Sequence, residues 1–213
     1  YTPSAADIAA GSVTLTLTAQ SAAPCVSATD DMVLTISLLA TADAGVDATI
    51  CEGSTYTLST ASATNAASVT WSSNGTGSFD NVNLVNATYT PSAADILNGS
   101  VILTMTVTSA APCAGDVDQM TLTINPQAIV SAGTDATICE SSTYTLTTAT
   151  ATDYTSLLWT SSGTGTFDDA TLLAATYTPS AADIAAGSVT LTLTAQSAAP
   201  CVEASDAMVL TIS

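Results

Sequence analysis

Apolar and polar residues alternate through much of the chain with a period of two. Residues 100–108 read SVILTMTVT, and residues 120–124 read MTLTI. A period of two is typical of half-buried antiparallel strands, and Thr and Val favour strands intrinsically. One face of the first segment is therefore expected to be apolar and the other rich in threonine, with the apolar face formed by Val101, Leu103, Met105 and Val107.

Shorter segments with strand-forming residues precede this pair. Thr55–Thr60 (TYTLST) and Ser68–Ser72 (SVTWS) read as two strands, and the NGTG of residues 74–77 is a turn signal. Two further short strands are expected near Ser78–Phe79 and around Ala87–Thr90. The pattern therefore predicts about seven short strands separated by turns.

Thr90–Ile96 (TPSAADI) interrupts the strand pattern. It has Pro91 early, and Ser92 and Asp95 stand at the spacing of a helix capping box. Asn98–Gly99 then ends the segment. A single helical turn is expected before the long strand of residues 100–108.

The pattern recurs along the chain. Residues 1–26 return without a change at residues 177–202, and a close relative begins at Tyr89, so the interval is 88 residues. Self-similarity of this kind indicates tandem repeats. The arithmetic gives the C-terminal part of one repeat and two complete repeats, over residues 1–37, 38–125 and 126–213.

An 88-residue unit with about seven strands fits a small β-sandwich of roughly 100 residues. Trp71 lies between Cys51 and Cys113, where an immunoglobulin-like domain keeps its core tryptophan. Tyr89 is expected to pack nearby. The predicted fold is all-β: tandem immunoglobulin-like antiparallel β-sandwiches, joined through short junctions at Leu38–Asp43 and Asn125–Ala132.

The composition excludes several functions. The chain has no Lys, Arg or His against 18 acidic residues, a formal net charge of −18. Nucleic-acid binding depends on cations that neutralise phosphates, and an anionic membrane surface repels such a chain. No apolar run is long enough to span a bilayer. We therefore expect neither nucleic-acid binding nor membrane insertion.

Enzyme chemistry lacks its side chains. Nucleophilic triads need a histidine base, and phosphoryl transfer needs Lys or Arg. The carboxylate pairs Asp168/Asp169 and Asp116/Asp118 have no recognisable catalytic context and read as solvated loop residues. The prediction is a non-enzymatic protein without a cofactor, calcium excepted.

Four strings together resemble the immunoglobulin-like repeats of giant cell-surface and gliding-associated proteins of Bacteroidota: DATICEGSTYTL, WSSNGTGSF, ATYTPSAADI and SVTLTLTA…APC. The resemblance covers the whole chain. It implies export by the type IX secretion system and an extracellular, cell-surface location. Within that group the chain is similar to long proteins that form surface fibres or grappling-hook appendages, which implies a filament built from several copies.

The five cysteines fall into two classes by repeat position. Cys51 and Cys139 precede the second strand of their repeats, whereas Cys25, Cys113 and Cys201 lie in the loop before the last strand. An extracellular setting favours disulfides. The absence of His and of CxxC spacing argues against zinc.

Three disulfide pairings are conceivable. Pairing within repeats joins Cys51 to Cys113 and Cys139 to Cys201; the spacing favours it, but the two loops lie at opposite ends of a standard sandwich. An eight-residue strand spans about 26 Å, whereas disulfide Cα atoms lie about 4.4–6.8 Å apart. Pairing between neighbours joins Cys51 to Cys201 and leaves the other three for partners elsewhere. The least favoured arrangement joins Cys25 to Cys51 and Cys113 to Cys139. The first two stay open, with neighbours slightly favoured.

Calcium is the one candidate ligand. It takes six to eight oxygen ligands and often stiffens extracellular modules. Acidic residues recur before the last strand, in a loop expected to face the preceding repeat, although no recognised calcium motif is present. The candidates are Asp30, Asp31, Asp116, Asp118, Glu203 and Asp206.

Two function classes follow. The favoured one is a spacer and self-assembly unit in a multi-chain extracellular filament. The alternative is an adhesin module whose loops bind a glycan or protein on another cell. Near-identical loops in different repeats favour uniform scaffolding over recognition.

Overall fold

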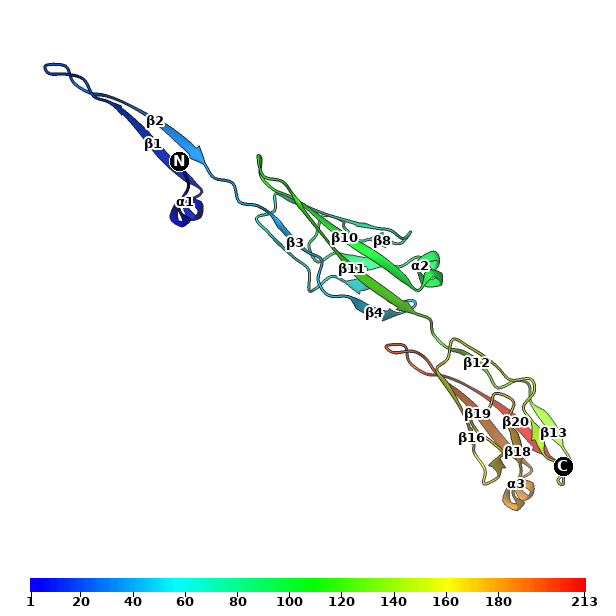
Figure 1. Ribbon diagram of the computed structural model, residues 1–213. Helices are drawn as coiled ribbons and strands as arrows, with labels where there is room; N and C mark the ends of the chain where they lie inside the picture. Colours follow the sequence, from blue (N-terminus) through cyan, green and yellow to red (C-terminus); the bar gives the residue numbers. More distant parts are fainter.

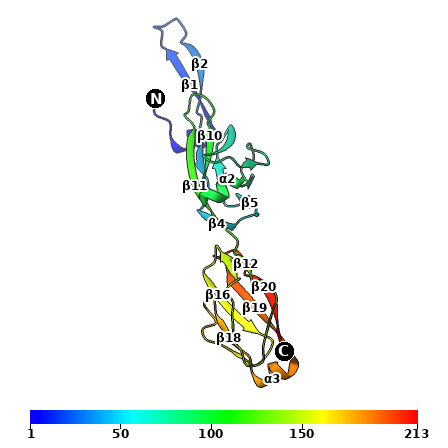
Figure 2. The same cartoon turned by 90° about the vertical axis from the view of Figure 1, so that its right-hand side faces the viewer.

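The computed structural model describes all 213 residues as an extended row of three units (Figure 1). The first unit is a helix, α1 (Ala5–Ala10), followed by a hairpin of β1 (Ser12–Ala19) and β2 (Ala28–Thr35). Two sandwiches follow it end to end, and a view turned by 90° shows the same linear order (Figure 2). None of the helices is long and apolar enough to cross a membrane.

The larger sheet of the second unit has four strands in the order β4-β11-β10-β7. The long hairpin of β10 (Ser100–Thr108) and β11 (Asp116–Asn125) forms its centre, because both strands alternate apolar and polar residues over their whole length. β7 (Ser68–Ser73) pairs antiparallel with β10, and β4 (Ala48–Cys51) pairs parallel with β11. β4 is thus an edge strand of this sheet, and Cys51 is its last residue.

The opposite face is covered by two smaller sheets. One pairs β3 (Thr41–Asp43) with β6 (Ser62–Thr64), and the other has the order β5-β9-β8, with β5 at Tyr56–Thr57, β9 at Thr88–Thr90 and β8 at Ser78–Phe79. The four-stranded sheet and the layer of two smaller sheets enclose one core, and with β4 beside β11 they make an immunoglobulin-like sandwich. The predicted all-β fold class is confirmed.

Two details of the strand prediction were wrong. Of the expected strand Thr55–Thr60 only β5 (Tyr56–Thr57) forms, because the chain then turns before β6, where the Ala61 N–H bonds to the carbonyl of Leu58. The expected junction Leu38–Asp43 contains β3, so the linker is shorter than the sequence suggested. The unit has nine strands instead of about seven.

The third unit repeats this order. Its strands and helix are β12 (Ile129–Ser131), β13 (Ala136–Ile138), β14 (Tyr144–Thr145), β15 (Thr150–Thr152), β16 (Ser156–Ser161), β17 (Thr166–Phe167), β18 (Thr176–Thr178), α3 (Ala181–Ala186), β19 (Ser188–Gln196) and β20 (Ala204–Ile212). The four-stranded sheet has the order β13-β20-β19-β16, which matches the second unit strand for strand.

Each complete unit has its own core, one within residues 40–124 and the other within 128–212. Trp71 is 2% exposed and Tyr89 is fully buried, as predicted, with Phe79 packed between them. The predicted helical turn is α2 (Ala93–Asn98). Its capping box joins Ser92 and Asp95, and Gly99 ends it at a φ of +73° that favours glycine.

The first unit contains only the helix and hairpin, so the inner face of its hairpin is open. Leu17 and Met32 are 74% and 56% exposed, whereas their counterparts Met105 and Met120 are at most 2% exposed. The shallow hollow beside these side chains is lined by both of them and by Leu15, Thr16, Asp30 and Asp31. Its position identifies it as uncovered core surface, not a ligand pocket.

Candidate functional site

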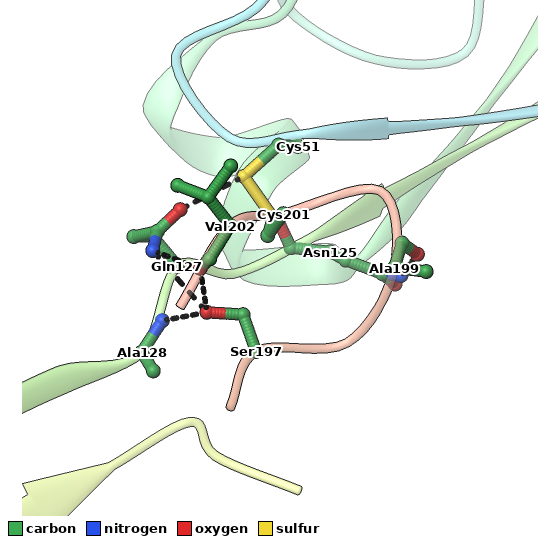
Figure 3. Close-up of a disulfide and its surroundings, with 8 residues drawn as sticks. All are labelled: Cys51, Asn125, Gln127, Ala128, Ser197, Ala199, Cys201 and Val202. Carbon is green, nitrogen blue, oxygen red and sulfur yellow. Dashed lines mark hydrogen bonds between the residues drawn. A yellow bond between two sulfur atoms is a disulfide. The ribbon is translucent and has the colours of Figure 1, made fainter. Parts of the chain in front are cut away.

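The junction between the second and third units is held by a disulfide between Cys51 and Cys201, with 4.9 Å between the Cα atoms (Figure 3). Cys51 ends β4, and Cys201 lies in the loop between β19 and β20. This is the pairing between neighbouring repeats. The pairing Cys51–Cys113 is not formed, because Cys113 lies beside Ser37, at the opposite end of its own repeat.

Hydrogen bonds fasten the same loop to the linker. The Gln127 side-chain amide donates to the carbonyl of Val202 at 2.6 Å and to the Ser197 hydroxyl at 3.2 Å. The Asn125 amide donates to the carbonyl of Ala199 at 2.6 Å (Figure 3). Consecutive repeats are therefore joined through the peptide chain, the disulfide and a set of polar contacts.

The junction between the first and second units is held by equivalent hydrogen bonds but has no disulfide. The Cys113 thiol donates to the carbonyl of Ser37 at 3.3 Å, and the Ser37 hydroxyl donates to the carbonyl of Ala111 at 3.1 Å. The Ser109 hydroxyl accepts the N–H of Ala40 at 2.8 Å. The cysteines outside the disulfide are Cys25, Cys113 and Cys139.

The acidic residues considered for calcium lie mainly in strands, not in loops as expected. Asp116 and Asp118 are in β11, and each accepts a backbone N–H, from Ala42 at 3.0 Å and from Ala44 at 2.8 Å. The Ala42 bond is the main reason that the pKa of Asp116 is lowered. These carboxylates therefore hold the β3 segment against β11.

The other candidates are dispersed. Asp30 and Asp31 lie on the exposed strand β2, Asp206 accepts the Ala132 N–H at 2.8 Å, and Glu203 accepts the Gln196 amide at 2.6 Å. No group of three or more acidic or other ligating side chains gathers in the chain. The structure thus does not bring the six candidates together into one site.

Asp168 and Asp169 organise a turn. Asp168 accepts the N–H groups of Thr176 and Asp169, both at 2.7 Å. Asp169 accepts the hydroxyl and N–H of Thr171. These bonds lower the pKa of both carboxyls, with the Thr176 bond the largest cause for Asp168 and the Thr171 hydroxyl for Asp169. Both residues are exposed and act as local acceptors.

A buried carboxylate recurs in each complete repeat, and sequence reasoning saw only its capping role. Asp183 is 3% exposed and accepts the Tyr177 hydroxyl at 2.8 Å, together with the N–H groups of Thr164, Gly165 and Ser180 at 2.9 Å. It joins α3 to the turn before β17. A Cβ on Gly163 would overlap this carboxylate, which explains the glycine.

Acid should weaken the third unit through Asp183. Burial raises its pKa, but the bonds from Ser180, Thr164 and Tyr177 outweigh burial and lower it to about 2. Because the folded pKa is below the unfolded value, the carboxylate stabilises the fold above about pH 4. We expect about 2 kcal/mol of unfolding free energy to be lost as the pH falls from about 4 to 2. Urea titrations across this range measure the loss, and a constant midpoint would contradict it.

No protein-family model and no curated protein matches this chain. Among solved structures it is similar to protocadherin gamma B2 extracellular cadherin domains, with a TM-score of 0.41 and 13% identity over 97% of this chain. A structure of three titin immunoglobulin domains has a TM-score of 0.42 and 15% sequence identity over 82% of this chain. The D00–D0 region of intimin has a TM-score of 0.41 and 12% sequence identity over 81% of this chain. The chain spans 60% of the protocadherin structure, 64% of the titin structure and all of the intimin one.

Proposed function

We propose that this chain is a structural segment of a long extracellular filament, in which its repeats act as stiff spacers and self-assembly units. The disulfide between Cys51 and Cys201 carries this proposal. A single peptide linker between two sandwiches is a hinge, whereas a second covalent connection at the same junction resists bending and pulling apart.

Stiffness comes from the geometry of the junction. The linker residues Asn125 and Gln127 bond the loop that bears Cys201, so the loop and the linker hold one another. The disulfide also closes a segment of 150 residues. Closing a loop of that length stabilises the folded chain by about 5 kcal/mol in the chain-entropy description. The disulfide thus stabilises the folded pair of repeats against unfolding.

The cell surface is the proposed location. Disulfides persist in oxidising, extracellular settings. The sequence resemblance to Bacteroidota surface repeats extends the proposal to type IX export and to surface fibres or grappling-hook appendages. The threonine-rich outer faces of the long hairpins carry little charge, which lets rods of several copies pack side by side.

Imaging of native cells tests the proposal. Antibodies against residues 126–213 should label fibres outside the cell, at positions that repeat along each fibre. Pre-immune serum on the same cells is the control. Labelling confined to the cell interior would contradict the proposal, and isolated flexible rods that bind a defined cell-surface glycan or protein would favour the adhesin alternative.

Calcium at the junctions stays a separate hypothesis. Its candidates in the complete repeats are Asp116, Asp118, Glu203 and Asp206, all four of which already accept backbone or side-chain N–H bonds. A rise in melting temperature with millimolar calcium that a chelator reverses would support it. Identical melting curves in calcium and in chelator would exclude it.

A further inference from the structure

We propose that Cys113 and Cys139 are the two unfilled halves of further links of the Cys51–Cys201 kind, and that each joins a like repeat stacked at its end of the rod. The inference rests on the proposed function of the chain as a rod segment. It assigns a role to two cysteines that the structure leaves unpaired. The partner is another copy of the same repeat, in series.

Cys113 has the surroundings of Cys201. The Cys113 sulfur lies 3.3 Å from the carbonyl oxygen of Ser37, and the Cys201 sulfur lies 3.3 Å from that of Asn125. Both follow a proline in the sequence Ala-Ala-Pro-Cys, and the N–H of each cysteine bonds the carbonyl three residues back at 3.0 Å. Cys113 therefore already has the position from which its counterpart forms a disulfide.

Cys139 likewise has the surroundings of Cys51. Cys51 is the last residue of β4, which pairs parallel with β11, and Cys139 directly follows β13, which pairs parallel with β20. The next N–H bonds the last residue of the repeat, from Glu52 to Asn125 at 2.9 Å and from Glu140 to Ser213 at 3.2 Å. Cys139 is exposed at the end of the third unit, where a following repeat would bring its hairpin loop.

A hairpin loop of this kind is nearly constant between repeats. Residues 1–26 and 177–202 are identical, so the loop that bears Cys25 has the sequence of the loop that bears Cys201. Any like repeat placed after Ser213 thus offers a cysteine in the right chemical context. This internal equivalence, with one link of the series already formed, identifies the partner as a repeat of this chain's own kind.

The bond forms by thiol–disulfide exchange. The Cys139 thiolate attacks a low-molecular-weight disulfide such as oxidised glutathione and releases one glutathione thiolate. The second cysteine then displaces the other glutathione from Cys139. Two protein thiols lose two electrons and two protons, and one oxidised glutathione becomes two reduced ones.

Successive links would overlap. Each closes 150 residues, whereas repeats recur every 88, so Cys139 lies inside the loop closed by Cys51 and Cys201. Every junction between repeats would then be crossed by its own disulfide. The loop that each disulfide closes is longer than one repeat, so neighbouring loops would share part of the chain. Disulfides would then connect all the repeats along the rod. Reduction of any one of them would leave each repeat still linked by a disulfide to at least one neighbour.

Two extended chains test the proposal. In one, a copy of residues 126–213 follows Ser213; in the other, a copy of residues 38–88 precedes Tyr1 and completes the first sandwich. Both are refolded in a glutathione redox buffer and mapped without reduction. We expect Cys139 to be linked to the added copy's counterpart of Cys201, and Cys113 to the added copy's counterpart of Cys51, each losing its maleimide label.

Cysteine variants of the added copies provide the control. Replacing only the added copy's counterpart of Cys201 or Cys51 with serine should restore labelling of Cys139 or Cys113, with an unchanged circular dichroism spectrum. The proposal is overturned if either cysteine stays free while Cys51–Cys201 forms, or if it is linked between molecules instead. The map on purified chain is independent of cellular location, so its failure leaves the filament proposal standing.

Discussion

Pulled by its two ends, the oxidised chain should stop lengthening long before it is fully extended. Tension entering at residue 1 reaches Cys51, crosses the disulfide to Cys201 and leaves at residue 213, so residues 52–200 lie outside the load path. Reduction should add about 50 nm of contour length, since 150 residues at about 3.6 Å each become available. Single-molecule force spectroscopy with and without reductant measures this gain.

Matched variants separate the disulfide from other effects of reductant. Cys51→Ser should show the long extension without reductant, whereas Cys139→Ser should behave as the unaltered chain, because Cys139 is exposed and unpaired. An oxidised chain that extends over its whole length would contradict the load path. The expected result would mean that the brace shields most of both sandwiches from tension.

Asp183→Ala should strongly destabilise the third unit. It removes the common acceptor of three backbone N–H groups and the Tyr177 hydroxyl, and each buried donor left without a partner costs about 1–3 kcal/mol. Tyr177 keeps a partner in Ser161, at 2.8 Å. We expect a loss of about 4 kcal/mol and a fall in the melting temperature of the unit of about 20 °C. Differential scanning calorimetry measures both.

Asp7→Ala is the control for this prediction. Asp7 has the same place in the repeat, but it is exposed and bonds only Tyr1 and Ser4. Its removal should leave the melting of the third unit unchanged. A melting temperature of Asp183→Ala within about 2 °C of the unaltered chain would show that the buried carboxylate is dispensable.

Much of the fold could be predicted because it depends on neighbouring residues. The alternation over 100–108 specifies which side chains are buried, and the Ser92/Asp95 spacing with Gly99 specifies a capped helical turn. The strands β3 and β4 were harder to predict. They have only three and four residues, and they are strands because β6 and β11 provide partners distant in sequence.

The site depended more on the tertiary structure. Sequence spacing left two cysteine pairings open, since it specifies the end of a sandwich on which a cysteine lies but not how the next sandwich meets it. The acidic pairs considered for calcium could not be told apart from the sequence. In the structure the carboxylates of Asp116 and Asp118 each already accept a hydrogen bond from a backbone N–H. The hydrogen-bond partners of Asp183 include Thr164, which is 19 residues away, so no local sequence pattern predicts that Asp183 is buried.

By itself the sequence determined the repeat, its β-sandwich class and the absence of cationic chemistry, because periodicity and composition are properties of the chain alone. Only the tertiary structure decided that Cys51 meets Cys201 and that Asp183 is a buried acceptor. Both depend on segments that the fold brings together across a junction or a core, where the contacts of Gln127 and Tyr177 fix the geometry.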